Sequence, residues 1–268
     1  MGTSKSLSTP SGGDWSPLKE DITYQLGGSP RCTAAALVGR TLQAAGGIGS
    51  MSSTGVSGRS TGGGGRGSGG GSGTGARASR AVLELGGFGA SVAAQGLGQA
   101  LDRLGLGELR DRPAAEVVAR VAEHLSSRAD GLDRTLLTGA LRDTLLEVAN
   151  LDDSVAYQDL AESLESFLAA NGVEGLVESF LANLVYDQVW SLVEQWVLEK
   201  SNSNPDTEAL RSSVESACRQ LARDAMGSLK EDGRFDSVDW FGTDGAALAR
   251  DIVSDVERRL NSAAAEEA

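Results

Sequence analysis

The chain has 268 residues, of which only 4% are aromatic and 36 are glycine, and its formal net charge is -13. The charge is uneven: residues 1–80 hold 8 Lys and Arg against 3 Asp and Glu, which leaves 16 against 34, a balance of -18, for residues 81–268. Such an acidic body repels phosphate and argues against direct nucleic-acid binding. No apolar run is long enough for a membrane span or a secretory signal, so we expect no membrane contact and a cytoplasmic protein.

The N-terminal residues, MGTSKSLSTPSGGDWSPLKE, are rich in Ser, Thr and Gly and too polar to form a core. Trp15 is their one large apolar side chain, so the segment looks like a presented tail with an anchor. Short helices are expected at 17–26, where Pro17 suits the first helical position, and at 31–45. Each would be marginal alone, so we expect it to dock onto the body or onto a partner.

Residues 46–75 contain fifteen Gly and seven Ser, too few side chains to offset the entropy of ordering. We predict a flexible linker with a random-coil span of roughly 30 Å, which would let the N-terminal segment sample a wide volume. A GxGxxG match at Gly65, Gly67 and Gly70 lies inside this low-complexity sequence, and without a preceding strand it does not indicate a nucleotide site. The expected domains are a tail over 1–45, a linker over 46–77 and an acidic helical body over 78–268.

The body is predicted to be all-α, because apolar residues recur at helical spacing and no stretch alternates as a strand would. The expected fold is a multi-helix bundle behind a flexible N-terminal tail and a Gly/Ser-rich tether. Gly86, Gly87 and Gly89 are expected to break or kink the first helical region. Asn171-Gly172 is expected to end one helix before the longest one, whose 27 residues would form a central rod. The predicted helices span residues 78–85, 90–104, 113–127, 133–149, 156–170, 174–200, a segment starting at 204, and 244–261.

No catalytic constellation is recognisable in the body. His124 is the single histidine and is expected to be a packed or boundary residue, so nucleophilic catalysis lacks a base. Cys32 and Cys218 are far apart and outside any CxxC pattern, which favours neither zinc nor a disulfide. Asp236 and Asp239 belong to the best acidic cluster, but its spacing is not that of a calcium loop, so we expect a solvated loop with Asp244 as a helix cap. We therefore predict no metal and no cofactor, and a protein that is not an enzyme; an autonomous enzyme using residues 232–244 is the remaining alternative.

The N-terminus carries the one reactive group that the sequence singles out. Removal of Met1 would expose the α-amine of Gly2, a nucleophile with an ordinary pKa of about 8. MGTSKS also fits the N-myristoylation pattern, but one acyl chain binds membranes weakly, and the Arg/Ala/Gly-rich composition is typical of bacteria, where this lipidation is not expected. The other alternative is a tail that is merely disordered.

The chain resembles the QatB family, the B component of bacterial Qat anti-phage defence systems. The residues that carry the resemblance are MGTSKS, SGGDW and PLKEDI near the N-terminus, then GLGQALDRLGL and a late VDWFGTDG. The resemblance implies three partners: a P-loop ATPase, a QueC-like enzyme of the deazaguanine pathway and a TatD-like nuclease. Since the motifs of those activities are missing here, it implies a non-catalytic component.

This resemblance suggests a chemical function for the α-amine of Gly2. A QueC-like enzyme activates a carboxyl with ATP, and the Gly2 amine is a suitable acceptor. We expect Thr3, Ser4 and Ser6 to be read by the partner in an extended conformation and Trp15 to anchor the segment. The alternative is a scaffold whose acidic body binds the ATPase or the nuclease without any modification.

Overall fold

The structure is a computed structural model that describes residues 15–48, 75–129, 131–150, 156–201, 203–235 and 238–265. These residues form eight α-helices and one 3-10 helix, with no strand among them, which confirms the predicted all-α bundle. The elements are α1 (Trp15–Leu26), α2 (Ala34–Ala45), α3 (Gly75–Arg103), η1 (Gly107–Asp111), α4 (Ala114–Leu125), α5 (Gly131–Ala149), α6 (Tyr157–Lys200), α7 (Asn204–Glu231) and α8 (Thr243–Ala265).

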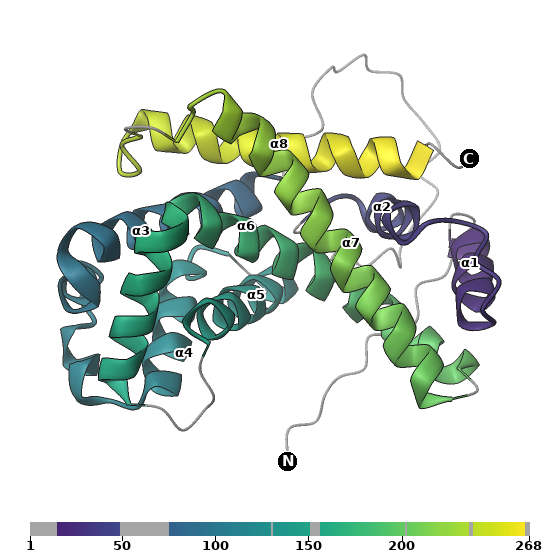
Figure 1. Cartoon of the computed structure of the whole chain (residues 1–268), viewed down its shortest axis with the longest axis horizontal. Coiled ribbons are helices and arrows are strands. Elements are labelled where there is room, and N and C mark those ends of the chain that lie inside the picture. Colours follow the sequence, from purple (N-terminus) through teal and green to yellow (C-terminus); the bar gives the residue numbers. More distant parts are fainter. Residues whose placement is uncertain are drawn as a thin grey trace, which may run out of the picture.

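Helix α6 is the centre of the bundle and packs against α3, α5 and α7 (Figure 1). Its two halves are the predicted helices over 156–170 and 174–200, joined across a kink at Gly172, where φ is 68° and ψ is -178°. Only glycine adopts this backbone region readily. The second half carries Phe180 and its neighbours, which are buried on more than one side as their density in the sequence predicted. These buried residues include Leu176, Val177, Phe180, Leu181, Leu184, Val185, Val189 and Val193.

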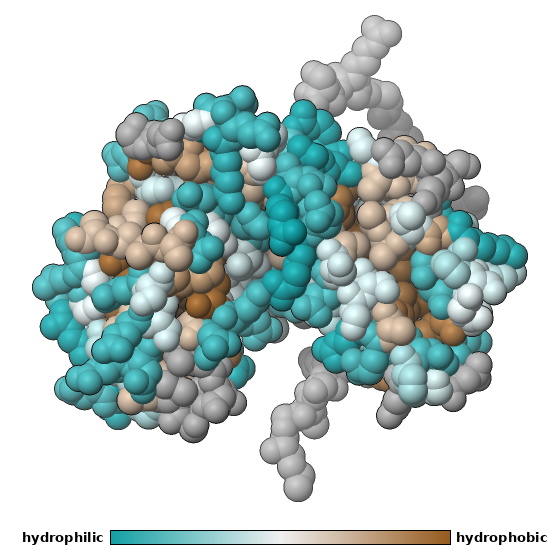
Figure 2. All heavy atoms as spheres, viewed as in Figure 1, coloured by the Kyte–Doolittle hydropathy of each residue, from teal (hydrophilic) through white to brown (hydrophobic). Residues whose placement is uncertain are grey.

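Helices α7 and α8 cover the centre from one side, and α1 and α2 lie beside them at the edge of the molecule (Figure 1). Figure 2 shows a hydrophilic band along the middle of this face, where α7 crosses the view. Side chains cap two of these helices as their sequences favour. The hydroxyl of Thr33 accepts from Ala36 N–H before α2, and that of Ser203 accepts from Asp206 N–H before α7. None of the described helices has both the length and the apolar content that a membrane crossing requires.

The expectation for the glycines of α3 is wrong. Gly86, Gly87 and Gly89 lie inside one continuous helix, and the kink is ten residues beyond Gly86, at Gly96. The three glycines instead allow other elements to come close: a Cβ at Gly86 would lie 2.1 Å from the ring of Trp240, and one at Gly89 would lie 3.0 Å from Leu176. Packing of these aromatic and aliphatic groups offsets the low helix propensity of glycine.

Candidate functional site

The N-terminal residues predicted to carry the function divide into two groups in the structure. Gly2, Thr3, Ser4 and Ser6 lie outside the described residues. Trp15 is the first residue of α1 and is only 4% exposed, in contact with the apolar core of the chain itself. In this conformation Trp15 anchors the segment to the protein's own body, and its predicted role toward a partner stays a prediction.

Helix α1 is attached to the body along one whole side. Leu18, Ile22 and Leu26 follow Trp15 at helical spacing and are buried with it. The indole N–H of Trp196 in α6 donates to the carbonyl oxygen of Lys19 over 3.2 Å, and the Lys19 ammonium lies 4.9 Å from the centre of the same indole ring. These contacts fix α1, and with it Trp15, on the body.

A half-buried ion pair joins the two N-terminal helices. Arg40 of α2 donates to Asp21 of α1 over 2.8 Å, and the two side chains are 24% and 13% exposed. The first two helices thus pack as part of the bundle, which decides between the two docking possibilities left open by the sequence.

The Gly/Ser-rich segment connects two points of the same body. At its start, the side-chain amide of Gln188 donates to the carbonyl oxygen of Gly47 over 2.8 Å, and Ile48 is fully buried. Ile48 and Glu257 of α8 line one pocket of about 320 Å³, and Gly75, where α3 begins, also lies beside the Glu257 carboxylate. Burial raises the pKa of Glu257. Residues 15–48 therefore pack against the body in this conformation, and the linker expected over 46–77 stays a prediction.

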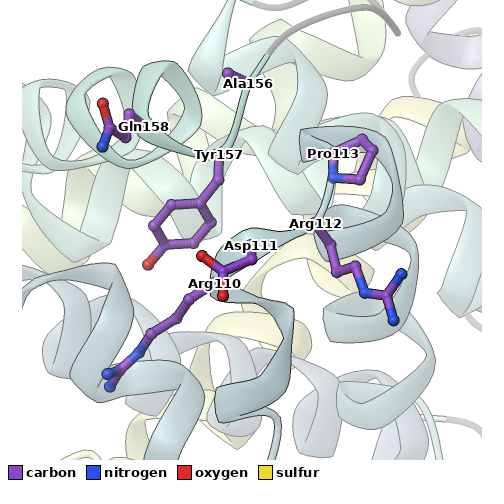
Figure 3. A pocket seen from close by; sticks show the side chains of 7 residues that line it. All are labelled: Arg110, Asp111, Arg112, Pro113, Ala156, Tyr157 and Gln158. Atoms are coloured by element: carbon purple, nitrogen blue, oxygen red, sulfur yellow. The ribbon is translucent and has the colours of Figure 1, made fainter.

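A second pocket, of about 640 Å³, lies between η1, the start of α4 and the start of α6. Figure 3 shows the Tyr157 ring and the Arg110 side chain on one side of it, with Asp111 between them and Arg112 directed away. Arg110 donates to the carbonyl oxygen of Gly98 over 2.8 Å and pairs with Asp102. Burial raises the pKa of the Tyr157 phenol, against the opposite influence of Arg110, so the phenol is a hydrogen-bond donor at neutral pH. Arg110 is thus already paired, and the residues that line this pocket do not combine a nucleophile with a base.

The other candidate catalytic groups are dispersed. His124 is exposed at the last turn of α4, at the edge of the buried stripe formed by Val121 and Leu125. Cys32 and Cys218 are free and buried, and burial raises the pKa of the Cys218 thiol, which makes that thiol unreactive. The most perturbed carboxyl is Asp187, where burial, followed by the charge of Asp143, raises the pKa to about 7.

The acidic loop before α8 is used for local hydrogen bonds. The Asp239 carboxylate accepts from Phe241 N–H over 3.0 Å, and the Asp239 carbonyl oxygen accepts from Gly245 N–H over 3.1 Å. Asp244 lies inside the first turn of α8, and Asp236 lies outside the described residues. Across the described ranges, no group of three or more His, Cys, Asp or Glu is placed to hold a metal ion.

Comparison with known proteins gives one match. A family model described as "Qat anti-phage system associated protein QatB" matches residues 66–239, which run from the end of the Gly/Ser-rich segment to the loop before α8. No curated protein and no solved structure matches the chain. The match omits α1, α2 and α8, so it rests on the helical body and not on the N-terminal motifs. Since it covers more than half of the sequence, the chain belongs to the QatB family and is a component of the Qat anti-phage system.

Proposed function

We propose that this chain is a non-catalytic component of the Qat system that presents the Gly2 amine to a QueC-like partner enzyme for covalent modification. The observation that supports the proposal is the fixed position of Trp15. Gly2 precedes Trp15 by thirteen residues, so its amine can reach at most about 45 Å from the buried indole. The polar segment would thus be offered from one defined place on the bundle.

The chemistry assigned to the partner is acyl transfer. The QueC-like enzyme would join a carboxylate to ATP, giving an acyl adenylate and pyrophosphate. The neutral Gly2 amine would attack the acyl carbon, forming an amide, losing a proton and expelling AMP. Nothing but the amine is required of this chain, which agrees with the dispersed arrangement of its ionisable groups.

Intact-protein mass spectrometry tests this directly. The chain would be purified after coexpression with the other Qat proteins, and in parallel without the QueC-like enzyme. We expect an added mass on the N-terminal peptide in the first sample alone. An unmodified Gly2 terminus in both samples would contradict the proposal.

Partner recognition by Thr3, Ser4 and Ser6 calls for matched variants. Alanine at these three positions together should lower the modified fraction, because the partner would lose side-chain hydrogen bonds to the segment. Alanine at Ser8, Thr9 and Ser11, which removes the same one Thr and two Ser hydroxyls further along the segment, is the control. Equal modification of both variants would contradict recognition of Thr3, Ser4 and Ser6 by the partner enzyme.

The second candidate function is a helical scaffold that binds the P-loop ATPase or the TatD-like nuclease without N-terminal modification. It is favoured by the family match, which starts at residue 66 and so lies on the body. Deleting residues 2–14 separates the two functions, since this cut keeps Trp15 and Leu18 in the core. Loss of phage defence with an intact complex supports presentation of Gly2, whereas full retention of both supports the scaffold.

A further inference from the structure

We infer that a pocket rich in arginine and aromatic side chains on α3 binds an acidic segment of a partner protein. This arginine pocket has a volume of about 300 Å³ and is lined in part by Arg80, Arg103, Arg128, Phe88, Trp240 and Phe241. It lies on α3, the end of α4 and the loop before α8. The inference is independent of Gly2 and goes beyond the function proposed above.

The kink at Gly96 builds the pocket by turning the end of α3 back on itself. Ser91 and Arg103 are twelve residues apart, which in a straight helix would place their backbones about 18 Å from each other. The guanidinium of Arg103 nevertheless donates to the Ser91 hydroxyl over 3.2 Å. The Glu165 carboxylate holds the turn by accepting from Leu97 N–H over 3.1 Å.

The glycines of α3 supply the floor. Trp240 is buried against Gly86, and the ring of Phe241 lies over Gly87, where a Cβ would be 3.2 Å from it. Phe241 is nevertheless 67% exposed, one of the few large apolar side chains of the described residues that face water. Arg103 lies 5.7 Å from the centre of the Phe241 ring. Arginine is enriched among the residues that dominate the binding energy of protein interfaces, and Phe is among the aromatic residues enriched in interface cores.

The charge of the pocket is opposite to that of the molecule. Three arginines and one carboxylate, Glu84, line it, whereas the whole chain carries -13. Glu84 is shared between Arg128 at 3.3 Å and Arg80 at 3.8 Å. In the part of the chain that the structure describes, no carboxylate pairs with Arg103. A guanidinium in this setting matches a carboxylate well, and the apolar floor suits an adjacent apolar side chain.

The long segments of this chain outside the described residues do not provide the complementary charge. Residues 49–74 contain no Asp or Glu and two Arg, and residues 1–14 contain one acid, Asp14, and one base, Lys5. Glu266 and Glu267 follow α8, whose 23 residues span about 34 Å from its start beside the pocket. The other acids outside the described residues, Asp130, Asp152, Asp153 and Asp236, lie in stretches of one to five residues within the body. A longer acidic segment must therefore come from another protein, and membership of the Qat system points to its companion proteins.

Binding assays with the full chain test this. Each other Qat protein would be purified and titrated against the immobilised chain at low and high NaCl concentration. The pocket variant combines Arg103→Glu and Phe241→Ala, and the control is Arg120→Glu, an exposed arginine of α4 outside the pocket. We expect one companion to bind the wild type and the control equally, and to bind the pocket variant at least about tenfold more weakly. Affinity for the wild type should fall with salt.

Charge exchange identifies the acidic segment. Replacing acidic residues of the bound companion by lysine should weaken its binding to the wild type and partly restore binding to Arg103→Glu. Thermal unfolding of both variants should match the wild type, because the altered side chains are exposed. The inference is overturned if no companion binds, if the pocket variant binds as tightly as the control, or if ATP or duplex DNA, added as probes, bind the wild type but not the pocket variant. Gly2 modification, measured by mass on the same samples, is a separate readout.

Discussion

The molecule contains two glycine-rich stretches with different structural consequences. Residues 46–75 are half glycine and run in sequence from the end of α2 to the start of α3, whereas Gly86, Gly87 and Gly89 lie within α3 and do not break it. In α3 the glycines face Trp240, Phe241 and Leu176, whose packing replaces the missing side chains. Glycine content alone therefore does not predict where a helix ends.

The largest expected effect follows from Gly86→Ala. The new methyl would lie 2.1 Å from the ring of Trp240, so this buried ring would have to move. Displacing this indole should cost about 3 kcal/mol of unfolding free energy, near the lower limit for loss of a buried aromatic side chain. Urea denaturation followed by circular dichroism gives the value, and a red shift of tryptophan fluorescence would report the displaced ring. An unchanged midpoint would contradict the close approach.

Gly39→Ala extends the comparison to α2. A Cβ at Gly39 would lie 2.4 Å from the carbonyl oxygen of Leu260 in α8, and this oxygen cannot rotate away because it belongs to the backbone. The two helices must separate, so we expect a loss of about 2 kcal/mol from overpacking. Hydrogen exchange measured by mass spectrometry should show faster exchange in α1 and α2 than in α6. Uniform exchange across all three helices would indicate that α2 adjusts without separating.

Gly96→Ala tests a glycine that is needed for its backbone angles, and whose Cβ would also lie 3.0 Å from the Glu165 carboxylate. Its φ of 81° and ψ of 164° are strained for any residue with a Cβ, and we expect a loss of about 1.5 kcal/mol. The same change should disturb the contact between Ser91 and Arg103, so binding at the arginine pocket should weaken as well. Stability measured by urea and affinity for the bound companion should fall together, and a loss in only one of them would separate the kink from the pocket.

Gly227→Ala should act in the opposite direction. Gly227 is in α7, and no atom lies within 4 Å of the position that its Cβ would occupy. Alanine there should stabilise the protein by about 1 kcal/mol because it has the higher helix propensity. A higher urea midpoint with an unchanged slope is the expected result, and it makes this variant the matched control for Gly86→Ala.

The smallest effect is expected in the predicted linker. Gly62→Ala, within the Gly/Ser-rich segment, should change the unfolding free energy by less than about 0.5 kcal/mol. A larger loss in the same urea assay would mean that this segment packs against the body and is not a linker.

The sequence predicted most of the helices because their signals are local. Pro17, the Asn171-Gly172 pair and the residues around Asn204 mark helix ends through backbone geometry, and the spacing of Leu and Val marks the buried sides. The observed helices agree with these signals to within a few residues, apart from the region of α3. The family was also recognised from the sequence, although the match lies on the body and not on the N-terminal motifs that seemed most specific.

The position of Trp15 and the arginine pocket could not be predicted in this way. Trp15 looked like an anchor for a partner because its neighbours are polar, but its burial depends on α6 and on the rest of the core, far away in the sequence. Arg80, Arg103 and Arg128 are separated by more than twenty residues from one another and follow no motif. Only the kink at Gly96 and the packing of the loop before α8 bring them to one place.

By itself the sequence determined the all-α class, the helix ends and the uneven charge, since propensity, capping and side-chain period act over a few residues. The tertiary structure decided which glycines admit an aromatic ring, that α1 and α2 belong to the bundle, and that three arginines meet on an acidic protein. These features depend on contacts between distant segments, which have no local pattern because packing joins residues by their positions in space.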